Sequence, residues 1–294
     1  MKIGAESIQT VATCLKEGTQ ILESAGVPEA EISASELLSN VLKRPRLSLY
    51  LEPETTVDYL RESEFENLLA KRASRYPLQY LISIVPFRHA LLEIGEGCLI
   101  PRPETEILID VVMKRLSTIE SIWVLDVGTG SGNIAISLAQ EYPKWRIVAT
   151  DISEGALPYA RINAVRNQVA SQIRFVQTNL FGGLGEFFDV LISNPPYLTA
   201  SELEHLQPEV AFEPRIALDG REDGLYFFKD IIRNSRKVLK PGGFIFFEMG
   251  INQANAVSSM LEANDFESIQ IEKDDSGIER FISARMNSET TART

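Results

Sequence analysis

The sequence is poor in the residues that mark disulfide-stabilised, metal-binding and membrane-spanning proteins. It contains only two cysteines, Cys14 and Cys98, which lie far apart and lack the spacing of a zinc site. No apolar run approaches the length of a membrane span, and no apolar signal core follows Met1. We therefore expect a cytoplasmic protein that binds no metal and no membrane.

Positive charge is also scarce. The chain has 29 Lys and Arg against 41 Asp and Glu, a formal net charge of −12, and a pI of about 4.8. Enzymes that act on duplex DNA gain affinity largely by neutralising phosphates, so this charge argues against direct DNA binding. Local basic clusters at 43–46 and 71–75 are either solvated faces or a patch that meets a partner protein or ribosomal RNA.

The two common phosphate-binding signatures are missing as well. After an apolar run at 123–127, glycines occupy three alternate positions, Gly128, Gly130 and Gly132, around Thr129 and ahead of a helix predicted near residue 133. This spacing is not G-x-G-x-x-G, and no Gly-Lys-Ser/Thr follows, which argues against NAD and a P-loop. Alternate glycines still let the backbone pass close to a ligand at a helix start, although a structural turn also fits.

Asp126 stands at the head of this glycine loop. A carboxylate there repels a pyrophosphate and attracts an ammonium or sulfonium group. A cofactor with a ribose, a cationic amino-acid tail and no phosphate fits both observations. The loop therefore favours S-adenosylmethionine.

The next predicted strand, at 146–150, ends at Asp151 and Ile152. An acidic residue about twenty positions past a glycine loop commonly meets ribose hydroxyls. Ser153 is the better cap for the following helix, so capping does not require Asp151. We expect Asp151 to bind the ribose.

A third strand, predicted at 173–178, is followed by Asn179 and Leu180. The amide and its apolar neighbours are expected to line an adenine pocket. The alternative for Asn179 is an ordinary turn residue at a strand end.

A strand predicted at 188–193 runs directly into Asn194, Pro195, Pro196 and Tyr197. Two prolines fix φ and remove two backbone donors, so the sheet ends here and the Asn194 amide and Pro195 carbonyl face outward. Acceptor oxygens beside an aromatic ring suit a planar NH₂ group, either the exocyclic amine of a base or the amide of Asn or Gln. The segment predicts a site that acts on such a nitrogen, with a strand-ending turn as the alternative.

The first part of the chain indicates a small domain and a linker. Helical spacing predicts a bundle over 1–75. Short strand-like runs with turns near Pro86 and at 95–97 predict a β-hairpin linker over 76–103.

Over 104–286, predicted strands alternate with predicted helices. This order is typical of an α/β fold with a doubly wound, mostly parallel sheet, here of seven strands. The last two strands, 269–273 and 280–285, lie too close for a crossover and should form an antiparallel hairpin. The tail at 287–294 is polar and expected to be disordered.

These motifs together resemble those of the HemK/PrmC family of protein-glutamine N5-methyltransferases. Asn-Pro-Pro-Tyr is shared with adenine-N6 DNA methyltransferases, whereas Ile-Pro-Arg-Pro-Glu-Thr-Glu ahead of the glycine loop is much more restrictive. The resemblance rests on Arg72, Pro77-Leu78-Gln79-Tyr80, residues 99–106, 126–132 and 194–197, Glu213-Pro214, Ala217-Leu218, Glu248-Met249-Gly250, Gln253 and residues 275–280.

The resemblance implies a Rossmann-like, class I S-adenosylmethionine-dependent methyltransferase domain and an N-terminal helical domain that recognises the substrate. It implies methyl transfer to the N5 nitrogen of the Gln in the Gly-Gly-Gln motif of class I peptide chain release factors, with S-adenosylhomocysteine as product. This modification supports translation termination. The residues it implies for catalysis are Asn194, Pro195 and Tyr197, and those for the substrate cleft also include Pro196, Arg102 and Pro103. We expect a monomer.

Two positions depart from the family pattern. Ser83 stands where members usually carry Gly, which can alter the hairpin, and Asn179 stands where an acidic residue is common. Neither removes a group that the chemistry needs. Glu104 and Glu106 are explained by the favourable interaction of carboxylates with the start of a helix.

Two other functions would also fit parts of this sequence. A nucleic-acid adenine methyltransferase would need a basic groove, which the pI opposes. A non-catalytic module that retains the fold would not need Asp126, Asp151 and Asn194, all of which are present.

Overall fold

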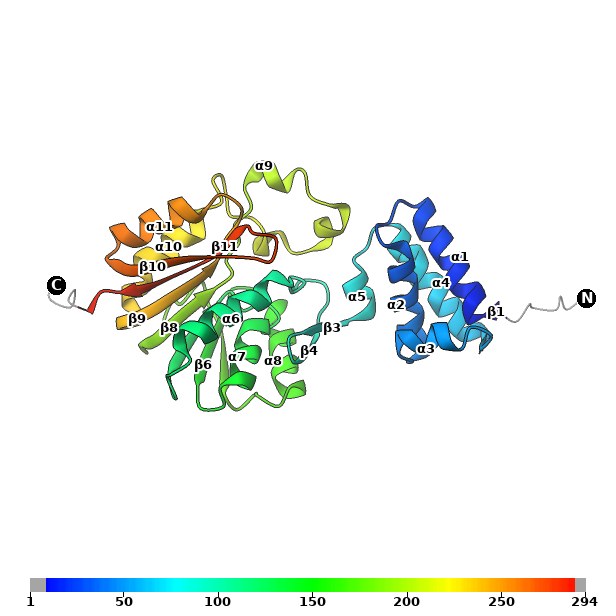
Figure 1. Cartoon of the computed structure of the whole chain (residues 1–294), viewed down its shortest axis with the longest axis horizontal. Coiled ribbons are helices and arrows are strands. Elements are labelled where there is room, and N and C mark those ends of the chain that lie inside the picture. The colour runs from blue at the N-terminus through cyan, green and yellow to red at the C-terminus, as the bar shows by residue number, and fades with distance from the viewer. Residues whose placement is uncertain (1–8, 289–294) are drawn as a thin grey trace, which may run out of the picture. The chain divides into compact units, whose positions relative to one another are not determined.

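The computed structural model describes residues 9–288, which divide into two units. The helical unit comprises residues up to 83 together with residues 207–212, and the sheet unit comprises residues 84–206 and those from 213 on. Figure 1 shows the helices and strands of each. Of the predicted disordered tail, residues 289–294 lie outside the described residues.

The helical unit is a small bundle with its own apolar core, to which Leu22, Leu37, Leu38, Phe65 and Leu69 contribute. Side chains at two helix starts explain where these helices begin, because Thr10 and Asp58 accept backbone N–H groups of the first turn. The elements are β1 (Gln9–Thr10), α1 (Val11–Ser24), α2 (Ala30–Leu42), α3 (Arg46–Leu51), β2 (Thr56–Val57), α4 (Tyr59–Ala73) and α5 (Leu78–Ile82).

The region after residue 76 differs in part from its prediction. A short helix, α5, follows Pro77, and it ends at Ser83, whose φ of 64° explains why glycine suits this position. The predicted hairpin is present as β3 (Ile84–Phe87) paired antiparallel with β4 (Ala90–Glu93). The turn predicted near Pro86 lies at residues 88–89, while Pro86 itself lies inside β3, where a two-stranded sheet leaves an unpaired edge that tolerates proline.

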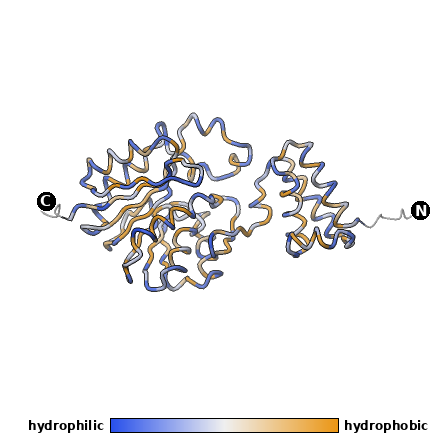
Figure 2. The backbone as a smooth tube through the Cα atoms, viewed as in Figure 1, coloured by the Kyte–Doolittle hydropathy of each residue, from blue (hydrophilic) through white to orange (hydrophobic). Residues whose placement is uncertain are grey.

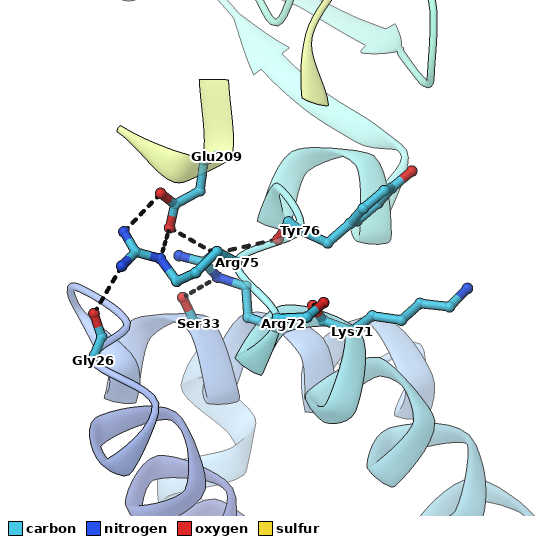
Figure 3. Close-up of polar contacts among 8 residues, drawn as sticks. Gly26, Ser33, Lys71, Arg72, Arg75, Tyr76 and Glu209 are labelled. Carbon is cyan, nitrogen blue, oxygen red and sulfur yellow. Dashed lines mark hydrogen bonds and ion pairs between the residues drawn. The ribbon is translucent and has the colours of Figure 1, made fainter. Parts of the chain in front are cut away.

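One carboxylate ties residues 207–212 into the helical unit. Glu209, in the 3₁₀ helix η1 (Pro208–Phe212), accepts the Arg72 Nη1 at 2.9 Å, the Arg75 Nε at 2.7 Å and the Arg75 Nη2 at 2.7 Å (Figure 3). Arg75 also donates to the Gly26 carbonyl at 3.1 Å. Burial opposes ionisation, but the hydrogen bonds from Arg75 and Arg72 prevail and lower the pKa of Glu209 to about 2.

This arrangement corrects the interpretation of the basic cluster at 71–75. Arg72 is only 5% exposed, and both arginines are engaged by Glu209. Two of the three cations in this cluster therefore serve the internal structure of the helical unit and do not form a patch open to RNA.

The sheet unit contains the predicted seven-stranded, mostly parallel sheet (Figure 1), in the order β10-β11-β9-β8-β5-β6-β7. The last strand, β11, is antiparallel to both of its neighbours, as expected for the terminal hairpin. The strands are β5 (Trp123–Val127), β6 (Arg146–Asp151), β7 (Ile173–Gln177), β8 (Phe188–Ser193), β9 (Leu239–Glu248), β10 (Phe266–Lys273) and β11 (Glu279–Met286).

Helices cover both faces of this sheet. In Figure 1, α6, α7 and α8 lie on one face and α10 and α11 on the other, and Figure 2 shows hydrophobic residues along the strands between them. The helices are α6 (Glu104–Leu116), α7 (Asn133–Glu141), α8 (Ala156–Arg166), α9 (Ala200–Leu203), α10 (Tyr226–Asn234) and α11 (Ala254–Ala263), with 3₁₀ turns η2 (Arg215–Ala217) and η3 (Ser235–Lys237). Within residues 9–288, no helix combines the length and apolarity that a membrane crossing requires.

The strand order creates the place where a ligand can bind. From β5 the chain moves outward to β6 and β7, then returns to place β8 on the other side of β5. The connections after β5 and β8 therefore diverge, which opens a crevice at the carboxyl ends of these two strands. The glycine loop follows β5, and Asn194 follows β8.

Removal of the Glu209 charge should destabilise the helical unit. We expect Glu209→Gln to lower the free energy of unfolding at pH 7 by about 1–2 kcal/mol, because it leaves partly buried Arg72 and Arg75 without their carboxylate. The folded pKa is depressed, so this contribution is present above pH 4.5 and is lost as the pH falls toward 2. Urea unfolding at pH 7 and near pH 2 measures both.

The matched control is Glu64→Gln, an exposed glutamate on α4. It should unfold like the wild type at both pH values. A Glu209→Gln deficit that is equally large at both pH values would contradict the ionic role.

Candidate active site

The carboxyl ends of β5, β6 and β8 border a cavity of about 240 Å³ within the sheet unit. Eleven of the residues predicted from the sequence lie in its wall. They are Arg102, Gly128, Thr129, Gly130, Asp151, Ile152, Asn179, Leu180, Asn194, Pro195 and Pro196. The other four, Pro103, Asp126, Gly132 and Tyr197, are not among the lining residues.

Glycine occupies the three positions of the loop after β5 for different structural reasons. All three have positive φ, at 75° for Gly128, 55° for Gly130 and 84° for Gly132. A Cβ on either of the first two would meet no atom within 4 Å, so these positions leave space free beside the cavity. A Cβ on Gly132 would lie 3.0 Å from the Ile136 Cδ1 and 3.3 Å from the Ala160 Cβ, so Gly132 permits the packing of α7 against α8.

Asp126 supports the glycine loop from beneath. Its side chain is fully buried, and its Oδ2 accepts the Thr129 hydroxyl at 2.6 Å. The other oxygen has no hydrogen-bond partner among the described residues. Burial raises the pKa of Asp126 to about 7, so this carboxyl changes charge near neutral pH.

Asp151 is the carboxylate that lines the cavity itself. Its Oδ2 accepts the Gly130 N–H at 2.8 Å, and its Oδ1 accepts the Ser153 N–H at 2.8 Å. Burial raises the pKa of Asp151, and these two hydrogen bonds oppose that effect. Each carboxylate oxygen accepts more than one hydrogen bond, so Asp151 can brace the loop and still accept a ligand hydroxyl.

Ser153 makes the capping hydrogen bond that the sequence predicted, although Gly155 is the residue that directly precedes α8. The Ser153 Oγ accepts the Ala156 N–H at 3.1 Å at the start of α8. The cap and the carboxylate are therefore separate residues, as expected.

The end of β8 is fixed to its neighbour before the Asn-Pro-Pro-Tyr segment begins. Ser193 donates to the Val127 carbonyl of β5 at 2.7 Å. Asn194, Pro195 and Pro196 follow at the cavity wall. Tyr197 lies behind that wall, where it packs against the apolar core and its hydroxyl donates to the Glu248 Oε1 at 3.4 Å.

Sequence reasoning missed Thr105 and Glu248 as site residues. Glu248 ends β9 with 1% exposure, and its Oε2 accepts the Thr105 hydroxyl at 2.6 Å. Thr105 in turn accepts the Asn194 Nδ2 at 3.2 Å. Burial raises the pKa of Glu248 to about 7. The available signal was an acidic residue at the end of the apolar run 244–248.

Two further polar residues hold the segments around the cavity. Glu213 accepts the Arg102 Nη2 at 2.6 Å and the Ile100 N–H at 3.0 Å. Gln253 donates to the Tyr197 carbonyl at 3.0 Å and accepts the Gly250 N–H at 2.8 Å. Glu213 thus holds one arginine side chain and one backbone N–H group, and Gln253 holds the backbone of two neighbouring segments.

Comparison with known proteins identifies the family of this chain. The Methyltransferase small domain family matches residues 103–210, and the PrmC N-terminal domain family matches residues 13–82. The Release factor glutamine methyltransferase of Thermodesulfovibrio yellowstonii is 38% identical over 85% of this chain and 90% of its own length. The chain belongs to the release factor glutamine methyltransferase family.

Other members of the release factor glutamine methyltransferase family match over almost the full length. The protein of Geobacter sulfurreducens is 35% identical over 95% of this chain and 98% of its own, and that of Synechocystis is 36% identical over 97% and 99%. The resemblance inferred from the motifs is thus confirmed.

Solved structures confirm the fold class. The hMettl16 catalytic domain has a TM-score of 0.57 at 18% identity, covering 78% of this chain and 84% of that one. A methyltransferase from Pyrococcus furiosus has a TM-score of 0.51 at 19% identity, covering 68% and 90%. The sheet unit therefore has a methyltransferase fold.

The two glycine environments predict different losses of stability. We expect Gly132→Ala to lower the free energy of unfolding by about 2–4 kcal/mol, because positive φ and the contact with Ile136 both oppose a Cβ. Gly128→Ala should cost only about 1 kcal/mol, since positive φ alone opposes it. Thermal unfolding of the two variants measures the difference, and equal losses would contradict the packing role of Gly132.

Proposed function

We propose that this protein transfers the methyl group of S-adenosylmethionine to the side-chain amide nitrogen of the Gln in the Gly-Gly-Gln motif of class I peptide chain release factors. The product formed from the cofactor is S-adenosylhomocysteine. One observation carries the proposal: Asn194 and Pro195, at the end of β8, line the same cavity as the glycine loop after β5. An acceptor pair for an amide and a cofactor loop therefore share one space.

The residues around the cavity fit S-adenosylmethionine. Gly128 and Gly130 leave free space beside the loop, and Asp151 offers carboxylate oxygens to ribose hydroxyls. Ile152 and Leu180, with Asn179, would hold the adenine. When bound, the cofactor supplies a methyl group on a positively charged sulfur. No group of three or more potential metal ligands occurs within residues 9–288, and the proposed chemistry calls for none.

The reaction demands orientation of a weak nucleophile. The nitrogen of a Gln amide has a delocalised lone pair, so the site must hold it in line with the methyl carbon and stabilise the positive charge that develops on it. The Asn194 Oδ1 and the Pro195 carbonyl would accept its two N–H groups. The proton can leave after the nitrogen becomes cationic, so no general base is assigned.

Other residues act around this centre. Pro196 would complete the wall beside the substrate, Arg102 is held at the cavity by Glu213, and Pro103 begins the turn into α6. Tyr197 would hold the Asn-Pro-Pro-Tyr segment from behind through the Glu248 carboxylate. We propose that the helical unit recognises the release factor, and that the enzyme acts as a cytoplasmic monomer without binding DNA.

The first test is mass spectrometry of a class I release factor after incubation with this protein and S-adenosylmethionine. We expect the peptide that carries Gly-Gly-Gln to gain one methyl group on Gln. Asn194→Ala should lower kcat by about 100-fold or more, the loss typical of removing one preorganised polar contact to a reacting group.

Asn255→Ala, an exposed residue on α11 of the sheet unit that does not line the cavity, is the matched control and should methylate like the wild type. Methylation of a nucleic-acid adenine with no methyl on Gln would overturn the substrate assignment. Full activity of Asn194→Ala would overturn the site.

Asp151→Asn should weaken S-adenosylmethionine binding by about 10- to 100-fold, equivalent to the 1.5–3 kcal/mol of a hydrogen bond to a charged group. The amide keeps one acceptor oxygen where two oxygens now receive the Gly130 and Ser153 N–H groups. Isothermal titration calorimetry measures this change, with Asp275→Asn, an exposed residue, as the control. Unchanged affinity would remove Asp151 from the cofactor site.

A further inference from the structure

The orientation of one side-chain amide decides whether the proposed site can bind its substrate. The Asn194 amide presents an acceptor oxygen on one side and a donor NH₂ group on the other. The substrate nitrogen offers N–H donors. If the Asn194 amide turned by 180°, two donors would face each other and the substrate would be repelled.

A chain of hydrogen bonds selects the productive orientation. The Glu248 Oε2 accepts the Thr105 hydroxyl at 2.6 Å, so the only proton of that hydroxyl is engaged. Thr105 can then act toward Asn194 only as an acceptor, and it receives the Asn194 Nδ2 at 3.2 Å. This leaves the Asn194 Oδ1 for the substrate.

The second oxygen of Glu248 is also engaged. Tyr197 donates to Oε1 at 3.4 Å, so both carboxylate oxygens act as acceptors. The charged groups that face Glu248 are Arg280 on β11, which favours its ionised form, and Glu104 on α6, which opposes it. Glu248 is 1% exposed, so water has little access to its carboxylate. Loss of one of these hydrogen-bond partners would therefore cost free energy.

We propose that Glu248 is a positioning residue that acts through the Thr105 hydroxyl to hold the Asn194 amide with its oxygen toward the substrate. This inference rests on the proposed function, because it assumes that the nitrogen held by Asn194 is the one methylated. Glu248 touches neither substrate nor cofactor in this role. Its effect is on the catalytic step and on the orientation of a neighbour.

Protonation of Glu248 should reverse the direction of the hydrogen bonds that run through Thr105 to Asn194. A neutral carboxyl can donate to Thr105, whose hydroxyl is then free to donate to the Asn194 oxygen and turn the amide. The pKa of Glu248 is raised by burial to about 7, so the productive ionised form prevails above pH 7 and is lost below it. At saturating cofactor, kcat should fall on the acid side of pH 7.

The experiment compares three variants with the wild type on the release factor. Thr105→Val keeps the shape but removes the hydroxyl, and we expect kcat to fall about 10- to 100-fold, the range for a lost supporting partner of a site residue. KM for the release factor and the affinity for S-adenosylmethionine should stay within about twofold. Thr105→Ser restores the hydroxyl and should recover most of kcat.

Glu248→Gln tests the titration. The Gln amide has only one acceptor oxygen, so it cannot accept hydrogen bonds from both Thr105 and Tyr197 as the carboxylate does. We therefore expect kcat to fall about tenfold, and the acid limb of the pH profile, which is the fall of kcat below pH 7, to disappear. Asp126 is the other buried carboxyl near the site whose pKa is about 7, but it lies under the cofactor loop and is unchanged in this variant. The loss of the limb in Glu248→Gln thus separates the two groups.

A measurement that does not depend on catalysis completes the test. In the protein without cofactor, the side-chain NH₂ signals of Asn194, assigned by their loss in Asn194→Asp, should shift in Thr105→Val and return in Thr105→Ser. Ser235→Ala is the stability control, because it removes another buried hydroxyl, one that donates to the Ile232 carbonyl and does not itself line the cavity. It should lower the melting temperature without lowering kcat.

The outcomes separate the inference from the function on which it rests. A wild type that methylates Gln, together with Thr105→Val and Glu248→Gln variants whose kcat and acid limb match it, would overturn the positioning role and leave the function standing. Equal losses in Thr105→Val and Thr105→Ser would also overturn it. A wild type that does not methylate the release factor would overturn the function, and the inference with it.

Discussion

The reversal of strand order between β5 and β8 is the constraint on which the site depends. Two parallel strands that lie side by side must end at the same edge of the sheet, and here the chain leaves them in opposite directions. The Ser193 hydroxyl bonded to the Val127 carbonyl holds the two ends in register at that point. The glycine loop and the Asn-Pro-Pro-Tyr segment therefore meet although more than sixty residues separate them, as the 66-residue span of this hydrogen bond shows.

Two buried carboxyls lie directly behind the residues that face the cavity. Asp126 holds Thr129 in the glycine loop, and Glu248 holds Thr105, which lines the cavity with Asn194, and Tyr197, which does not line it. Each contacts the wall through a hydroxyl, and burial raises the pKa of each to about 7. The hydrogen bonds of these carboxyls orient the polar groups of the wall. They do so although burial opposes the ionised form of each carboxyl.

Local sequence predicted the features that depend on local chemistry. Alternate glycines, a double proline after an apolar run, and the alternation of strands and helices indicated the loop, the strand end and the doubly wound sheet, because each is determined within a few residues. The contacts that escaped prediction join distant segments: Thr105 and Glu248 are 143 residues apart, and Arg72 and Glu209 are 137 apart. A single sequence carries no signal for which acidic residue meets which partner. The helix α5 was missed because five apolar and polar residues after a proline fit a short strand as well as one helical turn.

The hydrogen bonds that Arg72 and Arg75 donate to Glu209 affect how such a protein can evolve. The chain passes between the two units three times, after residues 83, 206 and 212, and one piece of the helical unit is encoded within the methyltransferase half of the gene. Exchange of the first 83 residues by a single recombination event would bring in a new bundle but keep the old Glu209. The first 83 residues are therefore not a self-contained module, because the carboxylate that Arg72 and Arg75 bind lies at Glu209, outside them.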